Sequence, residues 1–354
     1  MAKSAQLAKH LSARYPWSSP PLIVSAPMRG LSGPALATAV SRAGGLGFIA
    51  SDAQFLFRDL NDASTLVNGE SALCKAAPSS ILPIGVGFQL WADRLDAAAA
   101  AIEKFQPCAA WLFAPRQQED IATWMRRIRS VSPRTGIWVQ IGTVAEAEGL
   151  VKRSADCPDV IVVQGAEAGG HGRADDGTGL ISLLPEVADI LARKRAEIPL
   201  VAAGGIADGR GAAAALCLGA SGVAMGTRFL ASKEAQIPRG YQQEILRASN
   251  GGVSTTRTRL YLTLTGSPGW PKVYSPRAII NRSFRDYQAS RSRRVLKRLY
   301  DEAVKQGDAA WGPEGRAAAY AGASVGLIRD VKSAGDIVAD VRKGAVERTG
   351  SWQD

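Results

Sequence analysis

The chain has 354 residues, of which 46% are hydrophobic and 21% are charged, a composition typical of globular proteins and not of disordered or fibrous ones. No stretch approaches the ~18–20 uninterrupted apolar residues that a membrane-spanning helix requires, so we expect no membrane partner. The cysteines are Cys74, Cys108, Cys157 and Cys217. Because they are far apart and form no CxxC pair, a disulfide framework and a structural zinc site are disfavoured, and a reducing compartment is favoured.

The net charge of +11 is unevenly placed along the chain. Residues 239–300 contain 13 Lys and Arg against 2 Asp and Glu, so this segment alone carries a net charge of +11. A basic segment can bind nucleic acid or small anions, but no nucleic-acid recognition motif accompanies this one. We interpret it as a solvated or subunit-contact face of a monomer or homodimer and predict no nucleic-acid partner.

The N-terminal region is basic as well. Residues 1–51 contain five basic residues and no acidic one, a pattern that weakly resembles a transit peptide. Because residues 21–26 already have the pattern of a core strand, a removable leader would have to lie within the first ~18 residues. An exposed N-terminal helix is the simpler interpretation, so we expect a cytoplasmic protein, with import into an organelle left open.

Short apolar segments alternate with helical patterns along the first two thirds of the chain. The predicted strands are 21–27, 46–51, 82–88, 109–114, 136–142, 160–165, 200–204 and 222–229. The predicted helices between them include 33–43, 91–105, 118–131, 143–153, 183–194 and 209–218. The strand segments are continuously hydrophobic, as is typical of parallel strands that are covered on both faces.

Eight such units predict an α/β fold of the (β/α)8 type, the TIM barrel. A doubly wound Rossmann sheet is the alternative, but it usually has six strands, and no GxGxxG motif follows the first strand. We divide the chain into an N-terminal extension (1–20), the barrel (21–235) and an appendage over the mouth of the barrel with C-terminal helices (236–354).

Two glycine-rich turns follow the last two predicted strands. One is Ala202–Gly211, written AAGGIADGRG, and the other contains Met225, Gly226 and Thr227. In many barrels a phosphate group binds at this place, held by backbone N–H groups and a helix N-terminus. Glycine permits the close approach because a Cβ would block it, and the Thr227 hydroxyl is a further donor. Tight turns required for barrel closure are the structural alternative.

His171 is the main candidate for chemistry. The chain has two histidines; His10 lies outside the predicted barrel, and His171 lies in the glycine-rich stretch 164–173 after the sixth strand. With a pKa near ~6.5 a histidine is suited to act as a general base. A buried structural histidine is the alternative, and a metal site is disfavoured because no second histidine is available.

Polar side chains surround this stretch. Glu167 and Arg173 flank His171 and could orient it or bind an anion, although an ordinary loop salt bridge explains them equally well. Gln140 and Gln164 end two neighbouring strands, where their amides could hydrogen-bond a heterocycle. No nucleophile elbow for a Ser-His-Asp triad is present.

Five motifs in order resemble the nitronate monooxygenase family, formerly called 2-nitropropane dioxygenases. They are SAPM (25–28), AGGLGFI (43–49), VQGAEAGGHG (163–172), AAGGIADGRG (202–211) and MGTRFLASKEA (225–235). The resemblance covers about residues 20–235 and continues more loosely through GWP (269–271) and YAGASVGLI (320–328). FMN-dependent enoyl-acyl-carrier-protein reductases and quinone reductases share the same barrel.

The resemblance implies a TIM barrel that binds FMN without a covalent bond. It implies flavin or phosphate contacts for Ala26, Pro27, Met28, Gly87, Gln140, Gln164, Gly169, Gly170, Gly204, Gly205, Ala224, Met225, Gly226 and Thr227. His171 matches the catalytic histidine of the family. Two departures stand out: Gly87 replaces a common Asn and cannot supply its amide, whereas Gln89 could, and the usual GGHRG reads GGHGR here.

The resemblance therefore implies oxidation of an alkyl nitronate, a small anion, or of the parent nitroalkane, by O2 to a carbonyl compound and nitrite. An NAD(P)H-dependent reductase of a quinone or enoyl thioester is the alternative, and a regulatory flavin-binding protein would leave His171 without a purpose. Among the aromatic residues after the last strand, we expect at least one of Tyr261, Trp270 and Tyr274 to line the substrate cleft.

Overall fold

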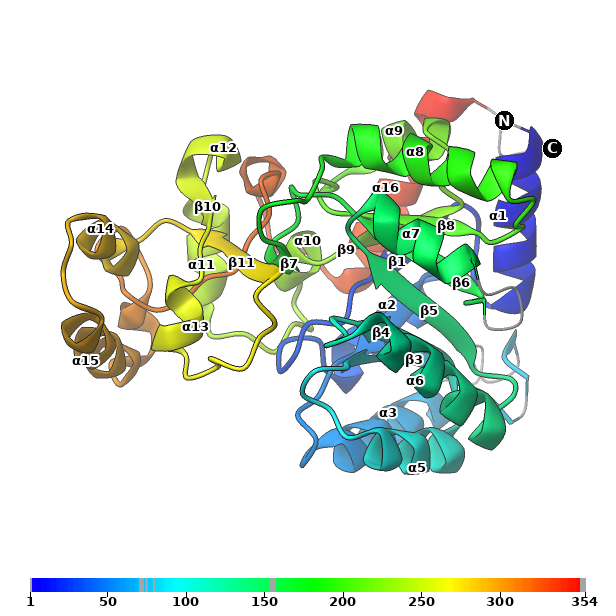
Figure 1. Cartoon of the computed structure of the whole chain (residues 1–354), viewed down its shortest axis with the longest axis horizontal. Coiled ribbons are helices and arrows are strands. Elements are labelled where there is room, and N and C mark those ends of the chain that lie inside the picture. Colours follow the sequence, from blue (N-terminus) through cyan, green and yellow to red (C-terminus); the bar gives the residue numbers. More distant parts are fainter. Residues whose placement is uncertain (1, 70–72, 74–75, 79, 153–156, 351–354) are drawn as a thin grey trace.

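The computed structural model describes residues 2–69, 73, 76–78, 80–152 and 157–350 (Figure 1). Within this part of the chain, eight parallel strands close into a barrel, and the last strand pairs with the first. The strands are β1 (Leu22–Ser25), β2 (Leu46–Ile49), β3 (Leu82–Gln89), β4 (Pro107–Phe113), β5 (Gly136–Ile141), β6 (Val160–Gln164), β8 (Leu200–Ala203) and β9 (Gly222–Met225). The predicted TIM barrel is confirmed, and the closing pair excludes an open doubly wound sheet.

Helices follow the strands and cover the outside of the barrel. They are α2 (Pro34–Arg42), α3 (Leu56–Asn68), α5 (Leu95–Phe105), α6 (Gln118–Val131), α7 (Val144–Val151), α8 (Leu180–Arg193) and α9 (Gly209–Cys217). The strand predicted over 222–229 is wrong in its second half. The chain turns at Gly226, and α10 (Thr227–Leu230) follows, with the N–H of Leu230 donating to the carbonyl of Gly226 at 3.1 Å. An apolar run does not by itself distinguish a strand from a short buried helix.

The C-terminal helix α16 (Ala334–Thr349) returns to the barrel. It packs on α9 and α2, beside β1. The backbones of α9 and α16 touch, because a Cβ added to Gly209 would lie 2.5 Å from the carbonyl carbon of Gly344. A boundary at residue 235 therefore does not separate barrel from appendage, since α16 belongs to the helical layer of the barrel.

The N-terminal helix α1 (Ala2–Arg14) is more than an exposed extension. Leu11 and Tyr15 are buried, and the Trp138 indole donates a hydrogen bond to the Tyr15 hydroxyl at 2.8 Å. A Cβ on Gly136, the first residue of β5, would lie 2.9 Å from the same hydroxyl. The helix and the residues after it therefore cover the amino-terminal end of the barrel, opposite the appendage in Figure 1.

The appendage lies beside the carboxyl ends of the barrel strands (Figure 1). Its elements are α11 (Arg239–Arg247), α12 (Gly251–Ser254), β10 (Thr255–Arg257), α13 (Leu260–Leu264), β11 (Tyr274–Ile279), α14 (Arg282–Gln288), α15 (Arg293–Val304), η2 (Gly307–Ala310) and η3 (Val325–Leu327). β11 pairs antiparallel with β10 on one side and on the other with β7 (Gly170–Arg173), which comes from the segment after β6. Barrel and appendage thus share one three-stranded sheet, and His171 lies in it.

Candidate active site

Amide and aromatic side chains line the mouth of the barrel. Gln89, Phe113, Gln140 and Gln164 lie at or near the carboxyl ends of β3 to β6, and each is partly exposed although the residue before it is buried. Parallel strands bring these ends to one edge, which is the catalytic face of this fold. The mouth therefore presents three amides and one aromatic ring side by side.

Two of these amides are already oriented by the protein. Gln140 Oε1 accepts a hydrogen bond from Trp111 Nε1 at 2.9 Å. Gln164 Nε2 donates to the carbonyl of His171 at 3.2 Å. Because Trp111 fixes which end of the Gln140 amide is the oxygen, the NH2 group of Gln140 is the end left to donate to a ligand.

The segment after β1 lies at the same mouth. Ala26, Pro27 and Met28 are partly exposed, and the N–H of Ala26 continues the pairing to β9 by donating to the carbonyl of Met225 at 3.0 Å. Gly87 lies directly under Pro27, since an added Cβ would be 2.3 Å from the Pro27 Cβ. In this structure the glycine makes room for the proline, and Gln89 is the amide on this strand.

The two glycine-rich turns come together because β8 and β9 are neighbours. Gly204 and Gly205 have φ angles of +90° and +76°, which glycine adopts readily and other residues rarely do. Within the described residues, the N–H groups of Gly204, Gly205, Gly226 and Thr227 donate no hydrogen bond. Four unpaired backbone donors at one edge of the mouth form a site suited to an anion.

The surroundings of these donors restrict which groups near the two turns remain free to bind an anion. Asp208 caps the N-terminus of α9 by accepting hydrogen bonds from the N–H groups of Arg210 and Gly211. These two N–H groups are therefore not available to an anion. The Thr227 hydroxyl accepts from the N–H of Gly322 at 3.0 Å and keeps its own hydrogen free to donate. Ala224 and Met225 are buried within β9, which leaves Gly226 and Thr227 as the accessible part of this turn.

Within the glycine-rich stretch after β6, His171 lies in a strand, β7. Its ring stacks on Trp270 with centroids 3.6 Å apart and an interplanar angle of 5°, and its Nε2 is buried without a hydrogen-bond partner. Burial, and then the positive charges of Arg257 and Arg259, lower the pKa of His171 to about 3. The expectation of a pKa near 6.5 is therefore wrong, because a desolvated imidazole among cations stays neutral.

The three predicted substrate aromatics have different surroundings. Trp270 and Tyr274 both pack against Phe113 at the mouth, with ring centroids 5.9 and 5.2 Å away. Tyr261 is fully buried in a core of the appendage, where its hydroxyl donates to Asn281 Oδ1 at 2.7 Å. Trp270 and Tyr274 are buried as well, but they lie in a cluster with Phe113 at the mouth, whereas Tyr261 belongs to a separate core of the appendage.

Glu167 and Arg173 are engaged in local structure. Both carboxylate oxygens of Glu167 accept a hydrogen bond from the N–H of Leu180. Leu180 is the first residue of α8, which therefore begins three residues earlier than the sequence predicts. Arg173 pairs with Asp176 and, at 3.1 Å, with Glu146. The ordinary salt-bridge interpretation fits Arg173, and within the described part of the chain neither side chain makes a polar contact with His171.

The structure adds three arginines that the sequence analysis had assigned to a solvated face. Arg257, Arg259 and Arg277 point inward, toward backbone carbonyl groups around His171 and Trp270. No carboxylate among the described residues lies within 4 Å of their guanidinium nitrogens. Spacing alone gives no signal of this, because Arg257 ends β10 and Arg259 directly precedes α13.

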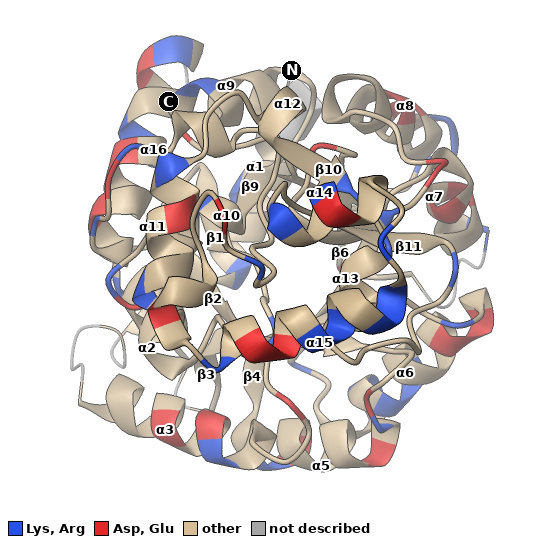
Figure 2. Ribbon diagram, turned by 90° about the vertical axis from the view of Figure 1, so that its left-hand side faces the viewer, with Lys and Arg blue, Asp and Glu red and all other residues tan. Residues whose placement is uncertain are grey.

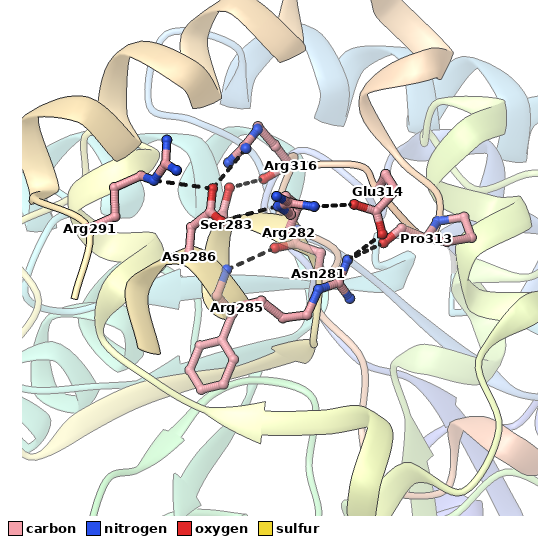
Figure 3. A network of polar contacts seen from close by, with 10 residues as sticks. Asn281, Arg282, Ser283, Arg285, Asp286, Arg291, Pro313, Glu314 and Arg316 are labelled. Carbon is pink, nitrogen blue, oxygen red and sulfur yellow. Dashed lines mark hydrogen bonds and ion pairs between the residues drawn. The ribbon is translucent and has the colours of Figure 1, made fainter. Parts of the chain in front are cut away.

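Other cations of the same basic segment are neutralised within the appendage. Asp286 contacts Arg282, Arg291 and Arg316, and Glu314 contacts Arg282 and Arg285 (Figure 3). Seen from the appendage side, acidic residues accompany the basic ones on α14 and α15 (Figure 2). The part of the basic charge that has no acidic partner therefore lies at the mouth of the barrel and not only on the outer face.

Two features of the described residues bear on other functions. No helix there is long and apolar enough to cross a membrane. No group of three or more His, Cys, Asp or Glu residues there has the arrangement to hold a metal ion.

Comparison with known proteins agrees with this geometry. The model of the nitronate monooxygenase family matches residues 126–343. A protein named nitronate monooxygenase npaC from Metarhizium robertsii is 55% identical, over 94% of this chain and 93% of its own. Two solved structures are similar: FabK from Thermotoga maritima (TM-score 0.73, 25% identity, 96% and 97% of the two chains) and nitroalkane oxidase from Streptomyces ansochromogenes (TM-score 0.71, 26% identity, 96% and 99%). The chain therefore belongs to the nitronate monooxygenase family of flavin-dependent oxidoreductases.

Proposed function

We propose that this protein is an FMN-dependent enzyme that oxidises alkyl nitronates with O2 to a carbonyl compound and nitrite. The observation that carries the proposal is the neutral His171 inside a shell of cations without carboxylate partners. Such a site favours an anionic ligand, because the ligand supplies the negative charge that the protein lacks there. A nitronate is a small anion with two oxygen acceptors, which fits this environment.

FMN fits the turns after β8 and β9. A Cβ added to Gly226 would meet only the Met28 side chain, with Sδ at 3.5 Å, so the space above this glycine is open to a ligand. The unpaired N–H groups of Gly204, Gly205, Gly226 and Thr227 would hold the phosphate, with the Thr227 hydroxyl as a fifth donor. The absence of an adenosine-binding motif favours FMN over FAD.

The remaining residues of the mouth would hold the flavin ring. Ala26, Pro27 and Met28 would lie against it, and the amides of Gln140 and Gln164 would face its polar edge. Gly170 offers open space, because a Cβ there would have no atom within 4 Å. Gly169 packs against the backbone of Gly322, so any contact it makes would be through its own backbone.

FMN would supply the redox chemistry with the nitronate and O2, and the protein would supply binding and orientation. His171 would contact the substrate as a neutral imidazole, through the Nε2 that has no partner in the protein. A group whose pKa is about 3 is poorly matched to removing a proton from a neutral nitroalkane at pH 7. We therefore favour preformed nitronates over nitroalkanes as substrates.

Trp270 and Tyr274 would line the substrate side of the mouth together with Phe113 and Trp91. Trp91, which no sequence motif indicates, lies 5.2 Å from Trp270 by ring centroids. Trp270, which stacks on His171, and the three rings packed against Trp270 favour a substrate with a small apolar body attached to its anionic group. A monomeric or dimeric protein in the cytoplasm stays a prediction from the sequence.

Two measurements on the purified protein test the proposal. Heat should release a yellow cofactor that co-migrates with FMN in chromatography. Incubation with propionate 3-nitronate under air should release nitrite. Anaerobic mixing with NADH or NADPH tests the reductase alternative: rapid bleaching of the flavin, with no nitrite formed in the aerobic assay, would contradict the proposal.

A further inference from the structure

Arg257 binds the segment that leads into His171. Its two terminal nitrogens donate to the carbonyl groups of Ala166 (3.1 Å), Ala168 (3.0 Å), Gly170 (3.4 Å) and Ser275. These nitrogens carry four hydrogens between them, so four carbonyl groups use all of them. Three of the four belong to residues 166–170, immediately before the histidine.

Arg259 binds the segment that carries the stacking partner of His171. It donates to the carbonyl groups of Trp270 (3.2 Å), Pro271 (3.2 Å), Lys272 (3.4 Å) and Tyr274 (2.6 Å). Both arginines come from one short stretch of the appendage, two residues apart. One stretch therefore holds both sides of the His171–Trp270 stack.

The sheet register explains how Arg257 reaches this segment. Arg257 pairs with Arg277 across β10 and β11, and Arg277 pairs with Gly170 across β11 and β7. Arg277 donates to the same Ala166 carbonyl at 3.2 Å. Gly172 leaves the space, since a Cβ there would lie 3.1 Å from Arg257 Nη1.

We propose that Arg257 and Arg259 form an arginine clamp, a pair of positioning residues that fixes His171 and Trp270 relative to each other for the substrate. The acceptors are neutral carbonyls, so the hydrogen bonds orient the two segments without cancelling the positive charge. The charge that faces His171 comes from Arg257 and Arg259, and the other ionisable ring beside it is Tyr320, at 5.7 Å. The clamp thus orients the histidine and maintains a cationic surrounding for an anion.

The clamp predicts that each arginine holds its own segment. We would measure hydrogen exchange by mass spectrometry on the full-length protein as purified, for Arg257→Met, Arg259→Met and wild type. Amide exchange should accelerate about tenfold or more over 165–173 in R257M, and over 268–275 in R259M. Arg298→Gln, which removes one charge from a side chain that is 71% exposed, is the matched control and should change neither segment.

Histidine NMR provides a second measurement, the protonation midpoint of His171. This midpoint would not change if Arg257 had a purely structural role. The chain has two histidines, so 15N-histidine labelling gives two sets of ring signals, and His171→Asn assigns them. R257M should raise the protonation midpoint of His171, because it removes a neighbouring charge and opens the segment. Arg257→Lys keeps the charge but cannot reach four carbonyls, so it should leave the midpoint near that of wild type while exchange over 165–173 accelerates.

The outcomes separate the clamp from its alternatives. Unchanged exchange over 165–173 in R257M and R257K would overturn the proposal, as would a uniform acceleration over the whole chain. If R257M does not fold, R257K gives the answer by the same segment-specific criterion. The substrate role of the clamp rests on the proposed function, but neither measurement requires substrate, so a failed nitrite assay and a failed clamp are distinguishable.

Discussion

His171 should remain neutral in the folded protein far below the pH at which an ordinary histidine becomes protonated. With a pKa of about 3, about 1% of the molecules carry a charged His171 at pH 5. A histidine with the ordinary pKa of about 6.5 would be about 97% protonated at that pH. The two cases therefore predict opposite protonation states of His171 at pH 5.

The same shift makes stability depend on pH, with a sign that follows from linkage. Between pH 6.5 and 3 the unfolded chain binds a proton at residue 171 that the folded chain does not bind, so the folded state loses stability as the pH falls. The loss is about 1.4 kcal/mol per pH unit, or about 2–3 kcal/mol between pH 6.5 and 4.5. Above about pH 8 the residue contributes almost nothing to this pH dependence, because it is neutral in both states.

The assay compares wild type with His171→Asn. Ring 15N shifts should show neutral His171 down to about pH 4.5, and the thermal midpoint of wild type should fall more steeply than that of H171N between pH 6.5 and 4.5. A protonation midpoint above about 5.5, or parallel thermal curves for the two proteins, would refute the reasoning. It would mean that water or a counter-ion reaches the ring despite the stack on Trp270.

Substitutions at four further positions follow from the contacts at the mouth. Gly226→Val should lower FMN content without lowering the thermal midpoint of the apoprotein, because an added Cβ has no backbone atom within 4 Å beyond its own chain neighbours. Gly204→Val should also destabilise the apoprotein, since its φ is +90° and its Cβ would lie 2.9 Å from the Gly165 carbonyl oxygen. Thr227→Val should weaken FMN binding by about fivefold to tenfold in a fluorescence titration, as expected when one hydrogen bond is lost, whereas Thr227→Ser should retain it. Trp270→Ala should raise the protonation midpoint of His171 in the NMR titration, because burial is the first cause of its low pKa; Trp270→Phe, which keeps a ring over the histidine, should leave the midpoint low.

The barrel could be predicted because each of its strands carries the signal locally. Continuous apolar runs such as Val160–Gln164 mark strands covered on both faces, and their number and spacing specify the closed form. The order of the glycine turns at Gly204 and Gly226 was visible in the same way. These features depend on neighbours within a few residues or on the next strand along the chain.

The surroundings of His171 could not be predicted in this way, because its partners come from distant parts of the chain. Gly170–Arg173 has a glycine-rich sequence that is typical of a loop, and it becomes a strand only by pairing with β11, about 100 residues later. Likewise, α16 completes the barrel although the whole appendage separates it from β9. Burial and the resulting pKa depend on these long-range contacts, which residue type and local spacing do not encode.

The distribution of positive charge connects the appendage to the chemistry of the mouth. A count over residues 239–300 treats all arginines alike, whereas the structure divides them into two groups. Arg282 and Arg285 are balanced by Glu314 and Asp286 within the appendage (Figure 3). Arg257 and Arg259 face only carbonyl oxygens beside a neutral histidine. Both arginines are partly buried, and a partly desolvated cation without a counter-ion is unfavourable. The second group therefore indicates where an anion is expected to bind, and the appendage contributes to the site as well as covering it.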